Sequence, residues 1–169
     1  MVKAIHRTSL FSLAVLALSL FAAPSFAGEV VPFAGEQKAG TIVVKTTERR
    51  LYLVTGNKQA IKYTVGVGRS GKQWFGTTSI VSKHIRPAWT PPADMRGNKE
   101  AYVIPSGAPN NPMGEAALVL ADHELAIHGT NNPGSIGGYV SWGCIRMHNA
   151  DILDLYSRVS VGTRVAIVN

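Results

Sequence analysis

The chain has 169 residues, a formal net charge of +7 and a single cysteine. Its basic residues are scattered, with no arginine-rich tract and no base-stacking motif, and this disfavours a nucleic-acid-binding protein. The length suits one domain with a substantial core. If the chain is exported, its charge fits a polyanionic surface such as a cell wall or outer envelope, with solubility alone as an equal alternative.

The first 27 residues are typical of a secretory signal peptide. Lys3 and Arg7 give a basic start, residues 10–23 are apolar, and residues 25–27 (Ser-Phe-Ala) place small side chains where a signal peptidase reads. A membrane-anchoring helix is the alternative, but the apolar run is short for a span and Pro24 follows it directly. We therefore predict a protein of the periplasm or cell envelope with no integral membrane segment after cleavage.

The next part of the chain predicts a tether followed by a β-hairpin. Residues 28–40 lack periodicity and predict a short tether. Residues 41–46 are β-branched, residues 51–54 alternate, and residues 60–68 resume an extended pattern after a turn at residues 56–57 (Gly-Asn). Two extended runs around such a turn indicate an N-terminal hairpin.

Further strands are predicted on both sides of a long loop. Residues 77–85 alternate, and residues 116–121 and 124–128 are apolar. Residues 93–114 between them are rich in Pro, Gly and Asn, which predicts a surface loop. Loops of this length are usually functional.

A single convincing helix is predicted near the C-terminus. Asn149 can cap it, Asp151 lies in its first turn, and Gly162 ends it before a closing strand at residues 163–168. Four apolar residues fall at helical spacing: Ile152, Leu155, Tyr156 and Val159. Residues 41–169 are therefore predicted to form one mostly β domain, a sandwich or a barrel-like sheet, with one packed α-helix.

Cys144 is the residue whose chemistry most needs an explanation. In an oxidising compartment a lone cysteine is a buried passive residue, half of an intermolecular bridge, or a reactive group. Only a few per cent of a free thiol is ionised at neutral pH, and an imidazole such as that of His128 can take the proton and form a reactive ion pair.

The residues beside Cys144 suit acyl transfer. Gly143 lets an acyl carbonyl approach the backbone, so that the N–H groups of residues 143 and 144 can face an oxyanion. Arg146 lies on the same face as Cys144 if the chain is extended there, and its guanidinium offers a fork for a carboxylate.

Two ordered motifs resemble the signature of the L,D-transpeptidases, the YkuD-type catalytic domain. His-Gly-Thr at residues 128–130 precedes Ser-x-Gly-Cys-Ile-Arg-Met at residues 141–147, with fifteen residues between His128 and Cys144. The resemblance extends over about residues 41–168. Three more segments are similar to the family's N-terminal half: Arg50–Val54, Val65–Gly68 and Trp89–Pro92.

The resemblance implies a peptidoglycan L,D-transpeptidase, a carbapenem target that acts in cell-wall organisation and cell shape. Cys144 would attack the third-residue carbonyl of a tetrapeptide stem and release D-alanine. The acyl group would pass to an amine, either of a second stem (a 3→3 cross-link) or of a wall-anchored lipoprotein. Transfer to water would make the protein an L,D-carboxypeptidase.

The resemblance also assigns roles to individual residues. His128 would be the base, and the carbonyl of Gly129 would orient its imidazole. Backbone amides of Trp142 and Gly143 would form the oxyanion site. Substrate contacts would come from three residues: Ser141, Arg146 and Thr130. No cofactor and no metal are expected.

Trp142 is a departure, since many family members have histidine there. An indole cannot shuttle protons, so we predict that it shapes the acyl pocket and offers only its backbone N–H.

Two other classes of function remain open from the sequence. One is a non-catalytic cell-wall-binding module that kept the fold. The other is a zinc peptidase that uses His128, Cys144 and a third ligand from among His84, His123 and His148. Residues 122–124 (Asp-His-Glu) lack a zinc-site spacing and resemble a polar turn.

Overall fold

The computed structural model describes residues 28–121 and 125–169. The predicted signal peptide and the Asp-His-Glu segment at residues 122–124 lie outside the described residues. Within the described ranges, no helix has both the length and the apolar character needed to cross a membrane.

The predicted N-terminal hairpin is confirmed. Strands β3 (Arg50–Gly56) and β4 (Gln59–Gly68) pair antiparallel around a two-residue turn. The turn residues Asn57 and Lys58 have φ values of 50° and 55°. Positive φ at both positions matches the right-handed twist of the strands, which is why such turns favour hairpins. Strand β2 (Ile42–Lys45) pairs antiparallel with β3 along the edge opposite β4.

The sheet closes on itself through β4, which pairs with both β3 and β9. Strand β10 (Arg164–Val168) lies parallel to β2 and antiparallel to β5 (Gly76–Ile85), and β5 continues into β6 (Ala116–Leu120) and β7 (Ala126–His128). Strand β9 (Ile145–Met147) joins β7 to β4, so the order β4-β3-β2-β10-β5-β6-β7-β9 returns to β4. The expected mostly β, barrel-like domain is thus confirmed as a closed eight-stranded barrel.

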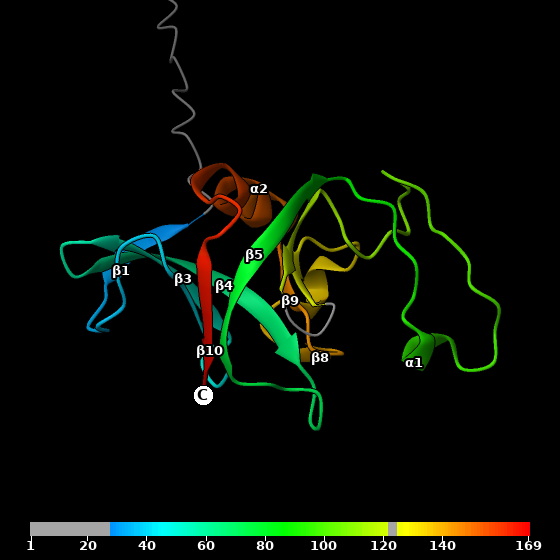
Figure 1. Cartoon of the computed structure of the whole chain (residues 1–169), viewed down its shortest axis with the longest axis horizontal. Coiled ribbons are helices and arrows are strands. Elements are labelled where there is room, and N and C mark those ends of the chain that lie inside the picture. The colour runs from blue at the N-terminus through cyan, green and yellow to red at the C-terminus, as the bar shows by residue number, and fades with distance from the viewer. Residues whose placement is uncertain (1–27, 122–124) are drawn as a thin grey trace, which may run out of the picture.

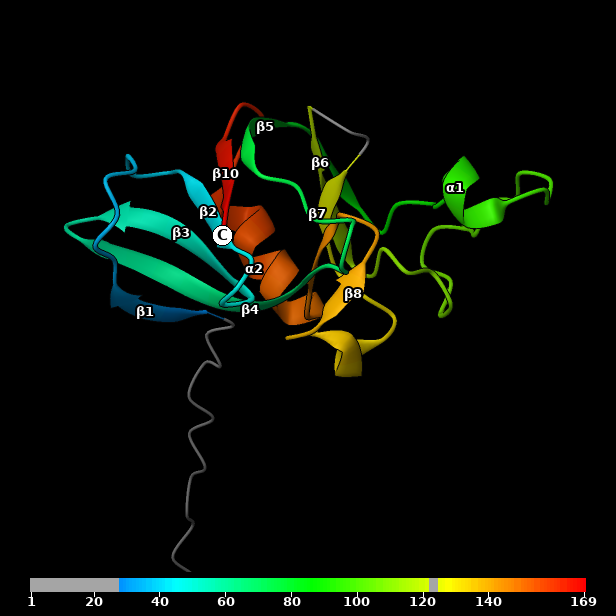
Figure 2. The ribbon, with the colours of Figure 1, turned by 90° about the horizontal axis from the view of Figure 1, so that it is seen from below.

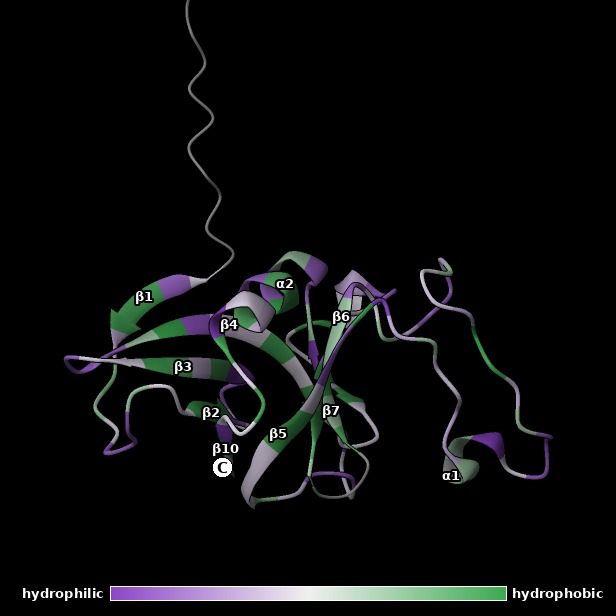
Figure 3. Ribbon diagram, turned by 45° about the horizontal axis from the view of Figure 1, so that its top comes forward, coloured by the Kyte–Doolittle hydropathy of each residue, from purple (hydrophilic) through white to green (hydrophobic). Residues whose placement is uncertain are grey.

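Helix α2 (Asn149–Arg158) packs into the barrel core. It buries Ile152 and Leu155 among the apolar side chains of the strands, and Figure 2 shows it in the middle of the molecule with strands on both flanks. In Figure 3 the hydrophobic colour follows the strands while the long loop is mostly pale or purple. Burial of these apolar faces stabilises the fold.

The start of α2 differs from the sequence-based expectation. His148 occupies the N-cap position without a side-chain cap bond, and Asn149 is the first helical residue. The side chain of Asn149 bonds instead to Glu115 and Thr130 on neighbouring segments. Asp151 lies in the first turn as predicted, and the helix ends at Arg158, before Gly162.

Three short strands were not predicted. Strand β1 (Glu29–Pro32) lies inside the predicted tether and pairs with β4. Most of its side chains are exposed, so backbone pairing holds it and no burial periodicity marks it. Strands β8 (Tyr139–Ser141) and β9 have three residues each, too few for a periodic pattern.

The long loop between β5 and β6 leaves the barrel and returns to it. Figure 1 shows the loop with the short helix α1 (Ala93–Arg96) extending beside the strands. The Nε of Arg86 donates to Glu115 at 2.7 Å and joins the two ends of the loop. The buried amide of Asn111 donates to the carbonyls of Pro87 and Pro105 at 2.8 and 3.0 Å. These bonds fix the base of the loop next to the end of β7.

Candidate active site

A cleft of about 570 Å³ brings together both halves of the predicted signature. His128, Ser141, Trp142, Cys144 and Arg146 line its floor. The long loop contributes one wall, which includes Trp89, Met95, Arg96, Pro112 and Met113.

Strand pairing explains why His128 and Cys144 share this cleft. Strands β7 and β9 are parallel neighbours, with Ile127 opposite Ile145 and His128 opposite Arg146. Cys144 immediately precedes β9, so it lies beside Ala126 at the start of β7. The barrel therefore positions the histidine on β7 and the cysteine directly before the adjacent strand β9.

His128 is buried and held in one orientation. Its side chain is only 4% exposed, and Nδ1 lies 2.7 Å from the carbonyl oxygen of Gly129. A carbonyl can only accept, so Nδ1 carries the proton and Nε2 is left as the basic nitrogen. Burial lowers the pKa of His128 to about 4, and the Arg146 charge acts in the same direction. The carbonyls of Gly129 and Pro112 oppose this shift.

The thiol of Cys144 is also neutral at rest. Burial raises its pKa above the ordinary value, while a hydrogen bond with the Ala126 backbone and the charge of Arg146 lower it. The sequence predicted a thiolate–imidazolium pair, but these directions favour a neutral thiol beside a neutral imidazole. Desolvation disfavours both ions, so burial opposes a resting ion pair.

Ser141 holds the turn that carries Cys144. Its hydroxyl donates to the carbonyl of Cys144 at 2.5 Å and accepts the N–H of Gly143 at 3.1 Å. Gly143 has φ of +128°, a conformation that favours glycine. Trp74 donates its Nε1–H to the Gly143 carbonyl at 3.2 Å. Hydrogen bonds from Ser141 and Trp74 thus fix the turn that carries Cys144.

These contacts bear on two predicted roles. Ser141 is fully buried, and its hydroxyl serves the turn. The N–H of Gly143 is engaged at rest, so serving an oxyanion requires that this bond be shared or given up. The substrate role of Ser141 and the oxyanion role of Gly143 stay predictions.

Trp142 lies at the cleft under two cations. The guanidinium carbon of Arg69 is 3.8 Å from the centroid of the indole ring, and Lys72 Nζ is 4.7 Å from it. Cations over an indole face are attracted to the ring quadrupole. The residue that replaces the more usual histidine therefore supports a positively charged rim.

Arg146 and Thr130 have contrasting environments. Nε of Arg146 is buried, and no partner for it exists among the described residues. Thr130 is 2% exposed and is not one of the residues that line the cleft. Its backbone N–H and carbonyl bond to Asn149, and its Oγ1 accepts the N–H of Asn132. Contact of Thr130 with substrate stays a prediction.

The candidate zinc ligands do not form a cluster in the described part of the chain. No group of three or more His, Cys, Asp or Glu residues is arranged there to hold a metal ion. His84 is bonded to Ser82 at 2.9 Å, and His148 occupies the N-cap position of α2 without a side-chain cap bond. His123 lies outside the described residues.

Comparison with known proteins identifies the family. The model of the YkuD family, described as the L,D-transpeptidase catalytic domain, matches residues 39–167. This chain belongs to the L,D-transpeptidase family. The match confirms the resemblance noted in the signature and covers both motifs.

Curated relatives carry the same family name. The chain is 40% identical over 139 residues to the probable L,D-transpeptidase YbiS of Escherichia coli K12, covering 76% of this chain and 44% of that protein. It is 56% identical over 59 residues to the putative L,D-transpeptidase YkuD of Bacillus subtilis 168, covering 35% of this chain and 36% of that protein. The chain thus spans less than half the length of these relatives.

Solved structures share the fold. L,D-transpeptidase 3 of Mycobacterium tuberculosis superimposes with a TM-score of 0.59 at 15% identity, over 76% of this chain and 60% of that one. The catalytic domain of the Enterococcus faecium L,D-transpeptidase gives 0.61 at 16% identity, over 79% and 99%. The barrel is therefore the fold of this family's catalytic domain.

Several residues of the site were not found by sequence reasoning. Trp74 and Asn149 each hold part of the catalytic segments, and Arg69 and Lys72 flank the indole. Asn149 had a sequence signal, but it was interpreted as a helix cap. The other three have no motif of their own, because only the fold brings them to the cleft.

Proposed function

We propose that this protein is a peptidoglycan L,D-transpeptidase with Cys144 as nucleophile and His128 as base. The observation that carries the proposal is the shared cleft, which His128 lines from β7 and Cys144 from the turn directly before the adjacent parallel strand β9. The 2.7 Å contact between Nδ1 of His128 and Gly129 supports it, because it leaves Nε2 available as the base. The acyl donor is a tetrapeptide stem of peptidoglycan, and no cofactor takes part.

The reaction begins from the neutral pair. As Sγ of Cys144 bonds to the third-residue carbonyl carbon, its proton passes to Nε2 of His128, and backbone amides of Trp142 and Gly143 stabilise the oxyanion. The imidazolium then gives the proton to the nitrogen of the leaving D-alanine. An incoming amine attacks the thioester, loses its proton through His128 and returns the free thiol.

Arg146 supports two features of this reaction, the ionisation of the thiol and the neutral state of the base. Its charge lowers the pKa of Cys144 and also that of His128, so it stabilises the thiolate and disfavours premature protonation of the base. A buried N–H without an acceptor is costly. Nε has no exposed surface, but Arg146 lines the cleft, so a contact between the rest of its guanidinium and an oxygen of the bound stem peptide is proposed from its position and charge.

Replacement of Arg146 separates its charge from its shape. We expect Arg146→Lys to keep the charge but lose the planar fork, and to lower kcat/KM by about tenfold or more, the value of a charged hydrogen bond. Arg146→Gln should lower it further and move the alkylation of Cys144 by iodoacetamide to higher pH. Steady-state kinetics and alkylation rates measure the two effects. An unchanged kcat/KM in both variants would remove Arg146 from the substrate site.

The acceptor decides the name of the activity. Purified protein should be incubated with tetrapeptide muropeptides and the products resolved by mass spectrometry. Release of D-alanine with formation of dimers supports transpeptidation, and release with tripeptides alone supports an L,D-carboxypeptidase. No release of D-alanine would favour a non-catalytic wall-binding module. A lipoprotein acceptor is tested by adding a lysine-bearing peptide.

Carbapenems provide an independent test of the nucleophile. Their strained acyl carbonyl and carboxylate suit a cysteine beside a cationic residue, so we expect a stable thioester on Cys144. Intact-protein mass should rise by one drug equivalent in the wild type and remain unchanged in Cys144→Ala. Labelling at another residue, or none after long incubation, would count against the assigned chemistry.

A further inference from the structure

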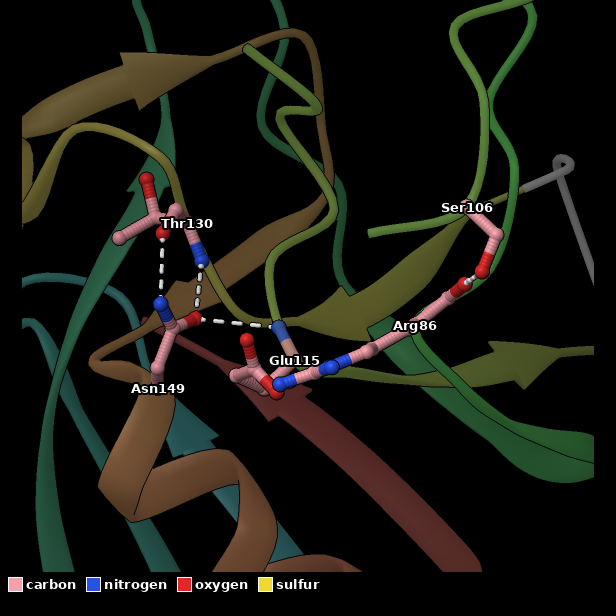
Figure 4. A network of polar contacts seen from close by, with 5 residues as sticks. All are labelled: Arg86, Ser106, Glu115, Thr130 and Asn149. Carbon is pink, nitrogen blue, oxygen red and sulfur yellow. Dashed lines mark hydrogen bonds and ion pairs between the residues drawn. The ribbon is translucent and has the colours of Figure 1, made fainter. Parts of the chain in front are cut away.

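Asn149 is the first residue of α2, and its side chain joins two backbone segments through three hydrogen bonds. Its Oδ1 accepts the N–H of Thr130 at 3.0 Å and the N–H of Glu115 at 3.2 Å. Its Nδ2 donates to the carbonyl of Thr130 at 3.0 Å. Figure 4 shows the amide between the end of β7 and the residue before β6. Both the oxygen and the nitrogen of the Asn149 amide thus bond to backbone groups of Glu115 and Thr130.

The chain is shaped to admit this amide. A Cβ atom added at Gly114 would lie 2.2 Å from Oδ1 of Asn149, and one added at Gly129 would lie 2.3 Å from it. Contacts this short do not occur, so both positions need glycine for the amide to approach the backbone. Gly114 also has φ of +63°. Two glycines from separate segments therefore enclose one side chain.

The bond to Thr130 controls the contact that orients the histidine. The carbonyl of Gly129 and the N–H of Thr130 belong to one planar peptide group. When Asn149 fixes the N–H, it also fixes the direction of the carbonyl that lies 2.7 Å from Nδ1 of His128. Accepting the N–H also polarises the carbonyl and strengthens its own hydrogen bond.

We propose that Asn149 is a positioning residue for the base: through the Gly129–Thr130 peptide group it fixes the tautomer and orientation of His128. Nδ1 holds the proton toward the Gly129 carbonyl, and Nε2 is left as the basic nitrogen in the cleft that Cys144 also lines. The expected effect of Asn149 on kinetics rests on the proposed function. Its expected effect on the tautomer of His128 does not. Asn149 does not touch the substrate.

The test compares two variants with a matched control. Asn149→Ala removes all three bonds, whereas Asn149→Asp keeps the oxygen that accepts the N–H of Thr130. Tyr63→Phe is the control, because Tyr63 donates to Asp154 at 2.6 Å and anchors the same helix away from the cleft. Thermal unfolding shows whether Asn149→Ala and Tyr63→Phe lose comparable stability.

The decisive readout is the tautomer of His128, measured by ¹H–¹⁵N NMR of the imidazole at neutral pH. We expect Nδ1–H alone in the wild type, in Asn149→Asp and in Tyr63→Phe, and a mixture of tautomers in Asn149→Ala. A single Nδ1–H tautomer in Asn149→Ala would overturn the proposal. If that variant does not fold, Asn149→Asp carries the test, since loss of the Nδ1–H tautomer there would overturn it equally.

Kinetics supply the second readout. Groups that orient metal-ligating histidines contribute about 10- to 100-fold in metal affinity or activity, and we take this as the scale for an oriented imidazole. We expect a loss of this size in kcat for Asn149→Ala, little change in KM, and recovery of much of kcat in Asn149→Asp. A kcat equal to that of Tyr63→Phe would overturn the positioning role. If the wild type releases no D-alanine, the proposed function fails, while the tautomer measurement still decides the role of Asn149.

Discussion

Cys144→Ala is expected to release no D-alanine from tetrapeptide stems, with turnover more than about a thousandfold below the wild type. Cys144 is the single cysteine, so no other residue can form a thioester, and the hydroxyl of Ser141 is committed to the turn instead of being free to form an ester. Stability should change little, because the variant removes one sulfur atom beside an open cleft. Product release by mass spectrometry and thermal unfolding measure the two effects.

Cys144→Ser is the matched variant for the same position. An alkoxide is harder to generate than a thiolate with the same base, so this variant should also be close to inactive. Turnover by Cys144→Ala at a tenth or more of the wild-type rate would disprove nucleophilic catalysis by the thiol. The muropeptide assay would then have to identify another acyl carrier.

Acidification from pH 6.5 to pH 4 is expected to cost the protein about 3 kcal/mol of unfolding free energy through His128 alone. The pKa of this histidine is lowered to about 4 in the fold from an ordinary value of 6.5. In this window the unfolded chain binds a proton that the folded chain does not bind. The stabilisation is therefore present above pH 6.5 and is lost as the pH falls through 4.

Urea unfolding of the wild type and of His128→Gln across this range measures the effect. The variant carries no ionisable group at this position, so its stability should depend less steeply on pH. Asp154 has a lowered pKa and contributes mainly below the window. Equal slopes in both proteins would show that His128 is not held neutral. The same variant should lose acyl transfer, because it lacks the base.

Much of the barrel could be predicted because most of its strands lie within alternating or apolar runs of the sequence. The β3–β4 hairpin combines alternation with a turn whose residues adopt positive φ, and both signals are local. Strand β9 has three residues and β1 exposes most of its side chains, so neither gives a periodic signal. Closure of the barrel through β4 and β9 depends on pairing between distant segments.

The candidate site was likewise predictable only in part. The motif identified His128 and Cys144, and the cleft contains both. The state of the pair was not predictable, because the pKa directions depend on burial, which the fold decides. Asn149 shows how a local interpretation fails. Asparagine before a helix commonly caps it, but here backbone N–H groups of Glu115 and Thr130 compete for its oxygen.

The position of β10 has a consequence for how the chain folds. This strand is the last in sequence, yet it lies between β2 and β5, and Val165 is opposite Ile42. Until residues 164–168 are available, β2 and β5 each present an open edge that can pair with other chains. Contacts between such distant segments form slowly, since loop closure precedes any gain from pairing. The barrel that aligns His128 with Cys144 is therefore completed only when the end of the domain has been made.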